Sequence, residues 1–580
     1  MSQDEELKAI KSHVHVDDLN ITSILSNQNV TINVDHEVDT DEAMILALGY
    51  KQEFKREFSL WSVFSVSFSV LGLLPSIASC FNYSQLVIGI SPISWIVAMV
   101  FICSVAFSMA EVSSAFPTSA GTPYAVSQLT PPKYSALLTW LTCFSNWLCQ
   151  ITAPPSVNYS VACMILALKS MNSKDYTPTN GHIYALTLGI QVSHAFISSL
   201  PTKWNARINT MSTITNMIFL VIVFVVILAG NKRQDHYDGI SKFNSNSIAW
   251  SLENQTAWPT GIAMLQSFLG AIWAMSGYDS PFHLSEECSN ASVAVPRAIV
   301  MTATCGGLIG WLFMIAISYT IVSIDQVAAD PQGLGQPFVT YLCQIMDIKL
   351  VNFATSLSII SGFFMGCSCM LAASRVTFAY SRDGLFPLSK YWKRVNETTR
   401  TPVNAVLINF FLGQLILLLI FAGSTAVGAI FSVGAISGFV SFTMPTLFKI
   451  TYAHNKFKPG PWSLGVFSRP IGFISVAFVL VMIPILCFPT KSGKALTTDQ
   501  MNWTVVVYFG PMLLAFISFI VDAHKWYKGP KTNIEEEDLM YGPGPVEVYD
   551  GVEEKINDDK NDAAETHVKE ENRNSIDNEQ

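Results

Sequence analysis

Hydrophobic residues along this chain gather in long runs that short polar stretches separate. A transmembrane helix needs about 20 consecutive apolar residues, and by this criterion the sequence predicts twelve spans. They fall near residues 60–82, 85–109, 134–168, 182–200, 209–230, 260–279, 297–323, 351–379, 403–423, 426–447, 471–489 and 502–523. The pattern therefore predicts an all-α membrane protein with twelve transmembrane helices.

Two of the predicted spans are interrupted near their middle. The first contains Gly72-Leu73-Leu74-Pro75-Ser76 and the sixth ends in Gly277-Tyr278-Asp279-Ser280-Pro281. Broken helices at corresponding positions of two halves are typical of transporters, in which unwound backbone lines the binding cavity. A simple kink is the alternative for either break alone. In the third span Pro154-Pro155 should kink the helix or end its first half.

Asp279 is the candidate with the strongest physical argument. A carboxylate inside an apolar run is costly and indicates a substrate or ion site. A cationic partner would stabilise it, and without one it would tend to take up a proton. Capping of the helix break is the structural alternative.

Composition narrows the class of protein further. Half of the residues are hydrophobic and only 13% are charged, which excludes an ordinary soluble protein. No nucleotide-binding loop, hydrolase elbow or zinc-binding motif is present, and most cysteines lie in apolar spans. We therefore expect no enzyme activity, no cofactor, no metal and no nucleic-acid partner, but contact with membrane lipid and a small-molecule substrate.

Charge separates the ends of the chain from its centre. Residues 1–56 and 531–580 are acidic and polar, which predicts disordered tails around a transporter domain at 57–530. No signal-peptide core precedes the first span, and Lys and Arg favour the loops on one side, so both termini are expected in the cytosol. Modification machinery could act on the tails.

Several motifs resemble the amino acid-polyamine-organocation permeases, and the resemblance covers roughly residues 45–530. The sixth-span region carries Asp279, Ser285-Glu286-Glu287 and Val295-Pro296-Arg297-Ala298-Ile299. Two further stretches are Phe116-Pro117-Thr118-Ser119-Ala120-Gly121 and Ser381-Arg382-Asp383-Gly384-Leu385-Phe386-Pro387. The first break and Lys458-Pro459-Gly460-Pro461 most resemble fungal γ-aminobutyrate permeases, whose relatives carry choline or polyamines.

The resemblance implies a five-plus-five inverted repeat with broken first and sixth helices, and alternating access to a site between them. In the first helix it assigns backbone contacts with a substrate carboxylate to five residues: Gly72, Leu74, Pro75, Ser76 and Ala78. Gly277, Tyr278 and Asp279 would face the substrate from the sixth helix.

Other residues are candidates for gating and coupling. Glu111, Glu286 and Glu287 fall near the predicted cytosolic ends of their spans, where ion pairs could form a gate; solvated charges are the alternative. Arg375 matches an arginine of the family. The resemblance implies that it anchors the scaffold by binding a carboxylate or helix carbonyl groups. Asn216 stands where several proton-coupled relatives have lysine. A coupling H⁺ would therefore need another group, such as Asp279 or Glu111; a different driving ion or exchange is the alternative.

These observations predict a secondary active transporter of a small amine or amino acid. γ-Aminobutyrate is the first choice and choline or a polyamine the next. A nutrient sensor built on a permease fold is the alternative of another class. The plasma membrane is the expected location, with the vacuole or another internal membrane as the alternative.

Overall fold

The structure is a computed structural model. It describes residues 56, 58–88, 91–173, 176–491, 496–497 and 501–530, which fall in one compact unit. The predicted acidic tails, apart from Arg56, lie outside the described residues, so their character stays a prediction. Within the described part the regular structure is helical, apart from one parallel β-bridge between Phe58 and Cys288.

The first five spans are built from six long helices, because the first span is divided into two. Its halves are α4 (Leu60–Leu71) and α5 (Leu73–Ile88), and the short helix α7 (Thr122–Leu129) follows the second span. The other four spans are α6 (Pro92–Ala115), α8 (Pro132–Asn172), α9 (Asn180–Ser198) and α10 (Thr202–Ala229).

The sixth span is also divided. It consists of α13 (Thr260–Ala274), a short helix α14 (Ser280–His283) and a 3₁₀ turn, η1 (Ser285–Glu287). The next four spans are α15 (Ala291–Thr320), α18 (Ile348–Arg382), α20 (Val403–Leu417) with η2 (Leu418–Ala422), and α21 (Ser424–Ile450). The last two are α22 (Ser468–Cys487) and α23 (Thr504–Ser518), the latter continued by a π-turn, η6 (Phe519–Ala523), and α24 (His524–Trp526).

Short helices lie in the connections. They are α11 (Arg233–His236), α12 (Asn246–Ala249), α16 (Ile324–Ala329), α17 (Pro337–Ile345), α19 (Ser389–Trp392) and η3 (Gly465–Phe467). Among the described residues ten helices are long and apolar enough to cross a membrane. The 19-residue α9 and the 15-residue α13 complete the predicted twelve.

Two expectations about span boundaries need correction. The second span begins at Pro92 rather than near residue 85, because α5 continues to Ile88. Apolar residues fill both segments, so hydrophobicity alone does not separate them; the helix start is fixed by the Ser91 cap and by Pro92 at the first position. The first half of α8 does not end at Pro154-Pro155, since the helix runs unbroken for 41 residues.

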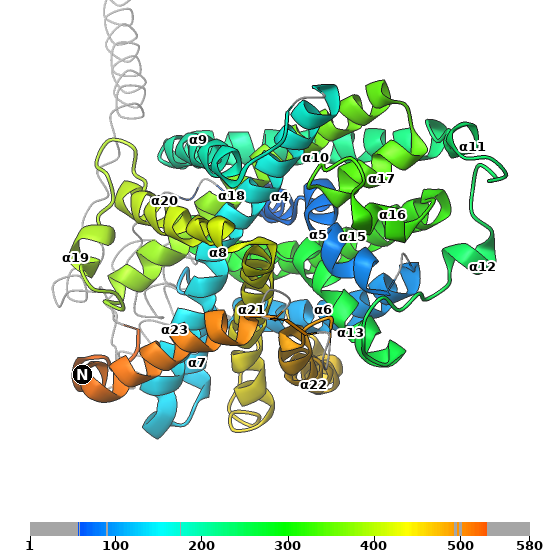
Figure 1. Cartoon of the computed structure of the whole chain (residues 1–580). Coiled ribbons are helices and arrows are strands. Elements are labelled where there is room, and N and C mark those ends of the chain that lie inside the picture. Colours follow the sequence, from blue (N-terminus) through cyan, green and yellow to red (C-terminus); the bar gives the residue numbers. More distant parts are fainter. Residues whose placement is uncertain are drawn as a thin grey trace, which may run out of the picture. The chain divides into compact units, whose positions relative to one another are not determined.

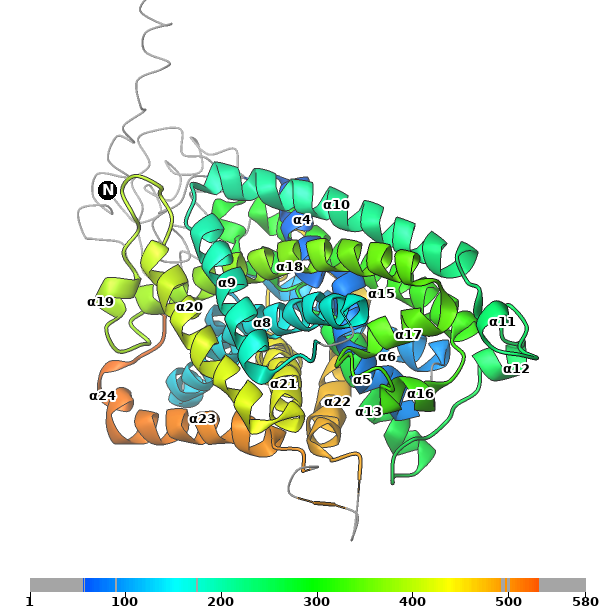
Figure 2. The same cartoon turned by 45° about the horizontal axis from the view of Figure 1, so that its top comes forward.

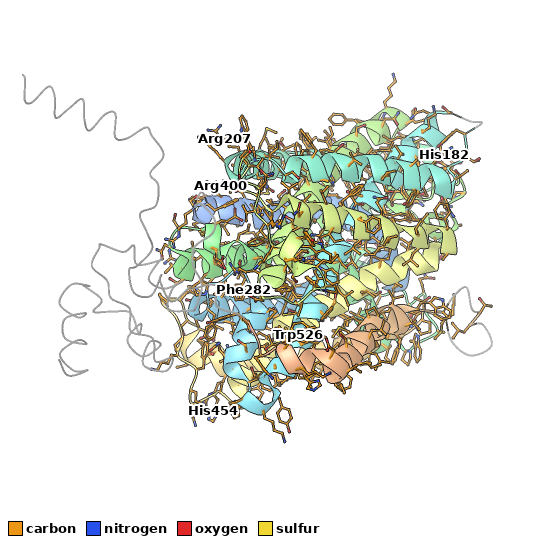
Figure 3. The ribbon with its side chains drawn as sticks, turned by 90° about the vertical axis from the view of Figure 1, so that its left-hand side faces the viewer. His182, Arg207, Phe282, Arg400, His454 and Trp526 are labelled. Atoms are coloured by element: carbon orange, nitrogen blue, oxygen red, sulfur yellow. The ribbon has the colours of Figure 1, made fainter. Side chains whose placement is uncertain are left out.

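The broken helices lie among the long unbroken ones. α8 and α18 run side by side (Figures 1 and 2), α13 packs on α5, and α15 packs on both α4 and α6. Figure 3 shows Phe282 of α14 surrounded by helices, with Arg207, Arg400 and His454 toward one end and His182 toward the other.

The two breaks contact each other. Gly72 (φ +43°) ends α4 in a left-handed conformation, and the Ser76 hydroxyl donates to the Leu71 carbonyl oxygen at 2.7 Å. Gly277 has φ +98°, and its carbonyl oxygen accepts a hydrogen bond from the Ser67 hydroxyl at 3.0 Å. Both glycines allow a backbone conformation that other residues adopt only with strain. The first and sixth helices are thus joined where each is unwound.

We expect Gly277→Ala to destabilise the fold. A Cβ atom there would lie 2.6 Å from Val70 Cγ1, and the positive φ adds strain. Together these effects should cost roughly 2–5 kcal/mol. Thermal unfolding in detergent would measure the loss. Gly189→Ala in α9 is the control, because a Cβ at that position meets nothing within 4 Å; equal losses for both variants would refute the prediction.

Candidate functional site

A cavity of about 50 Å³ lies beside the break in the sixth helix. Its walls come from α4, α8, α13, α18 and α21 together with the segment that joins α13 to α14. Most of the lining is apolar, including Met365, Phe439 and Phe442. Asp279 is the single carboxylate among the lining residues, and no lysine or arginine accompanies it there.

Asp279 lies immediately before α14 and is 4% exposed. Its Oδ2 accepts a hydrogen bond of 2.6 Å from Nε2 of Gln150 in α8, and His283 Nε2 lies 3.6 Å from the same oxygen. A neutral amide supports a carboxylate but does not cancel its charge. The cavity therefore has a negative charge that a cation would compensate.

Two further polar groups belong to cavity-lining residues. The Tyr278 hydroxyl and the Trp273 indole Nε1 are buried and have no hydrogen-bond partner within the described part of the chain. Buried polar groups are nearly always paired, so each unpaired one needs an explanation. The hydroxyl could accept a hydrogen bond from an ammonium group of a ligand, whereas the indole N–H only donates and would need an acceptor such as water or a ligand oxygen.

The predicted site residues of the first helix lie behind this cavity. Val70 is the lining residue that α4 and α5 contribute, whereas Gly72, Leu74, Pro75, Ser76 and Ala78 are buried but do not line it. Gly72 and Pro75 instead face α18, where Met365 and Gly362 lie. The structure thus brings Gly277, Tyr278 and Asp279 together at the cavity. The predicted first-helix residues pack around the break instead.

Three buried ion pairs hold the other predicted residues. Glu111 Oε2 lies 2.6 Å from Lys449 Nζ, and Glu111 also accepts from the Ser463 hydroxyl and the Leu464 N–H. Glu287 pairs with Arg375 at 3.0 Å and Glu286 with Arg382 at 2.8 Å. Glu286 additionally accepts from the backbone N–H and hydroxyl of Ser119. These pairs join α6 to α21 and the sixth helix to α18.

Asn216 lies away from the cavity lining. Its side-chain oxygen accepts a hydrogen bond of 2.7 Å from the Ser361 hydroxyl in α18. The residue therefore connects α10 to α18 through neutral groups.

Sequence reasoning missed Gln150, Trp273 and the specific partners Lys449 and Arg382. Gln150 had a usable signal, because it is an amide in an apolar run four residues before Pro154. The partners could not be assigned from the sequence, since each ion pair joins residues far apart in the chain.

The chain matches known proteins over almost all of its length. A family model described as amino acid permease matches residues 58–511. A "Putative polyamine transporter" of Candida albicans is 62% identical over 93% of this chain and 98% of its own length. An uncharacterised amino-acid permease of Schizosaccharomyces pombe is 49% identical over 92% and 98%. A GABA-specific permease of Saccharomyces cerevisiae is 31% identical over 89% and 90%.

These matches confirm the family, the all-α fold of about twelve helices and the expectation of a transporter rather than an enzyme. The helices long enough to cross a bilayer agree with a multi-pass membrane protein. With a family model that spans both broken helices and relatives aligned nearly end to end, the chain belongs to the amino acid permease family.

Proposed function

We propose that this chain is a secondary active transporter of small cationic amines, with polyamines as the first substrate class. The observation that carries the proposal is Asp279, a buried carboxylate in a cavity that contains no fixed cation. An ammonium group is the partner that offsets such a charge and donates hydrogen bonds to the carboxylate.

The same cavity makes γ-aminobutyrate the second choice. An amino acid needs donors for its carboxylate as well, and the first-helix backbone groups assigned to that role do not line the cavity, which leaves the Trp273 N–H and the Tyr278 hydroxyl for it. The identities point the same way, since the relative named for polyamines is 62% identical and the one named for GABA 31%. Choline fits the charge but has no N–H to donate to Asp279.

The three buried ion pairs support alternating access. Two of them join the broken sixth helix to α18 and the third joins α6 to α21, so their separation and reformation would open and close one end of the pathway. We place this end toward the cytosol, with both termini on that side and the protein in the plasma membrane. A sensor would bind the amine without accumulating it.

Asp279→Asn should reduce uptake of labelled putrescine or spermidine about 10- to 100-fold below saturation, the loss expected when a charged hydrogen bond becomes neutral. Uptake is measured in cells that lack their own amine permeases, with γ-aminobutyrate and choline as competitors. Asn keeps an acceptor for Gln150, so folding should be spared.

Asp325→Asn is the matched control, because this exposed carboxylate lies in α16 outside the cavity. Polyamine uptake that survives Asp279→Asn at normal surface expression would contradict the site. Uptake of γ-aminobutyrate alone by the unmodified protein would contradict the substrate class.

Glu111→Gln should destabilise the protein by roughly 3–5 kcal/mol, because it leaves Lys449 buried without its charge partner. The double variant Glu111→Gln with Lys449→Met removes both charges and should recover most of that loss. Thermal unfolding in detergent of the single and double variants measures the interaction energy between Glu111 and Lys449. Additive losses in the double variant would show that the two residues act independently.

A further inference from the structure

His283 lies one helical turn after Asp279 and is 2% exposed. Its Nδ1 is 3.3 Å from the Ser119 carbonyl oxygen, and its Nε2 is 3.3 Å from the side-chain nitrogen of Asn146 in α8. Asn146 also donates to the Tyr380 hydroxyl at 2.6 Å. The imidazole therefore connects the cavity carboxylate to α8, α18 and the loop before α7.

These contacts describe a neutral imidazole. A carbonyl oxygen only accepts, so Nδ1 carries the hydrogen, and an amide nitrogen only donates, so Nε2 offers its lone pair. That lone pair also faces Asp279 Oδ2 at 3.6 Å. Two acceptors that face each other across this distance repel, and a proton on Nε2 would convert them into a charged pair. The geometry is thus prepared to hold one additional proton.

Asn146 can satisfy both states of the ring. Its side-chain oxygen has no partner within the described residues. If the amide turns over, this oxygen can accept from a protonated Nε2 and from the Tyr380 hydroxyl. Rotation of the Asn146 amide therefore gives His283 a suitable hydrogen-bond partner in both its neutral and its protonated state, without movement of the backbone.

Other charges near the ring are already compensated. Two acidic residues lie in the same segment as His283. Asp279 faces the imidazole directly, and Glu286 is paired with Arg382. From α18, Arg375 is paired with Glu287 and Tyr380 is reached through Asn146. α4 has no titratable side chain, and the ionisable residue near the start of α15, Arg297, is exposed. The buried Asp383 after α18 is a further acidic group in this region, since its charge acts on Tyr380 and Tyr124, and it too has a partner. Asp279 is the acidic group that directly faces the ring, at 3.6 Å.

The ring is also held in place. A Cβ atom at Gly121 would lie 2.8 Å from His283 Cε1, so the loop backbone packs closely against the imidazole. The ring cannot swing away from Asp279 without displacing this loop.

We propose that Asp279 and His283 form a single cation site that holds either a proton or an ammonium group of the substrate, so that the chain exchanges protons for amines. This inference rests on the proposed function and adds the coupling ion and the residue that carries it. Asp279 supplies the negative charge, and His283 binds the proton through Nε2.

The exchange balances atoms and charge. In the proton-loaded state Nε2 carries the proton and the pair is a carboxylate beside an imidazolium, whereas the neutral ring described above is the state that has released the proton. When an ammonium group reaches Asp279, two positive charges would share one carboxylate, so the Nε2–H bond breaks and the proton passes to water. The site then holds a carboxylate, a neutral imidazole and one ammonium group, so the net charge of these three groups is the same as before. The second ammonium group of a diamine such as putrescine adds one charge, so each turnover moves one net positive charge across the membrane.

Other buried titratable groups fit this role less well. Glu111 is fixed by Lys449 and by several hydrogen bonds. His194 in α9 is fully buried, but both of its ring nitrogens lack partners among the described residues and no carboxylate lies in ion-pair contact with it. His283 has the carboxylate and the hydrogen-bond partners that a reversible proton site requires.

The test uses the full-length protein in proteoliposomes and labelled putrescine as the probe. In the first assay, vesicles loaded with unlabelled putrescine exchange it for labelled putrescine at equal pH. In the second, vesicles with a lumen more acidic than the medium accumulate labelled putrescine while a potassium ionophore clamps the potential. One-for-one exchange predicts about tenfold accumulation per pH unit, above the level in protein-free vesicles.

His283→Gln should abolish the second activity, whereas the first should fall far less, because the ammonium group binds Asp279 and not the imidazole. Its KM for putrescine should also stay constant as pH changes, whereas the KM of the unmodified protein should rise as pH falls, because protons compete with the ammonium group for the site. His194→Gln is the matched control for loss of a buried histidine and should keep both activities.

Each result decides between the two hypotheses. Gradient-driven accumulation that persists in His283→Gln, or accumulation driven by an acidic medium, overturns the proton site while the proposed function stands. Loss of both activities in His283→Gln, with normal folding by thermal unfolding, also overturns it, because His283 would then be required for amine binding itself. Absence of putrescine exchange by the unmodified protein overturns the proposed function and the coupling scheme with it.

Discussion

The cost of burying charge in an apolar environment constrains the whole arrangement. Removing an ion from water is expensive unless a partner of opposite charge and several hydrogen bonds replace the lost hydration. Glu111 and Glu286 meet this requirement through Lys449 and Arg382 and through further hydrogen bonds. Glu287 has the opposite charge of Arg375 beside it, although its Oε2 has no partner among the described residues. Asp279 lacks such a charge, because Gln150 and a neutral His283 provide polarity without charge. It is the buried carboxylate at the cavity that still lacks a cation.

The helix breaks explain how this carboxylate reaches the cavity. In an intact sixth helix the backbone N–H and C=O groups would pair with one another, and the side chains would follow the regular spacing of 3.6 residues per turn. The unwound segment instead turns at Gly277, whose carbonyl oxygen is held by Ser67 from the first helix. Asp279 follows two residues later and faces the cavity beside Gln150. The contact between the two breaks therefore fixes the position of the charge.

Much of the architecture could be predicted from the sequence, because apolar runs report membrane length directly. Asp279 was found by the same argument, since a carboxylate stands out in such a run. The site residues of the first helix were predicted from the resemblance to the permease family, by their position in the chain. The structure places Val70 rather than Ser76 at the cavity wall. A side chain's direction near a break depends on the turn geometry, which residue spacing does not specify. Gln150 and Lys449 required knowledge of which helices become neighbours.

The size of the cavity bears on the transport cycle. About 50 Å³ corresponds to a few water molecules, which is too little for an extended polyamine with its apolar carbon chain. Substrate binding must therefore enlarge the cavity, and α21 is one of the walls that could shift. Gly434 and Gly438 let it approach Trp273 and Cys149 so closely that a Cβ atom would lie about 3 Å from either. Because Lys449 near the end of α21 pairs with Glu111, a shift of this helix that admits substrate would also strain that ion pair, and the occupied cavity and the closed end would be coupled through one helix.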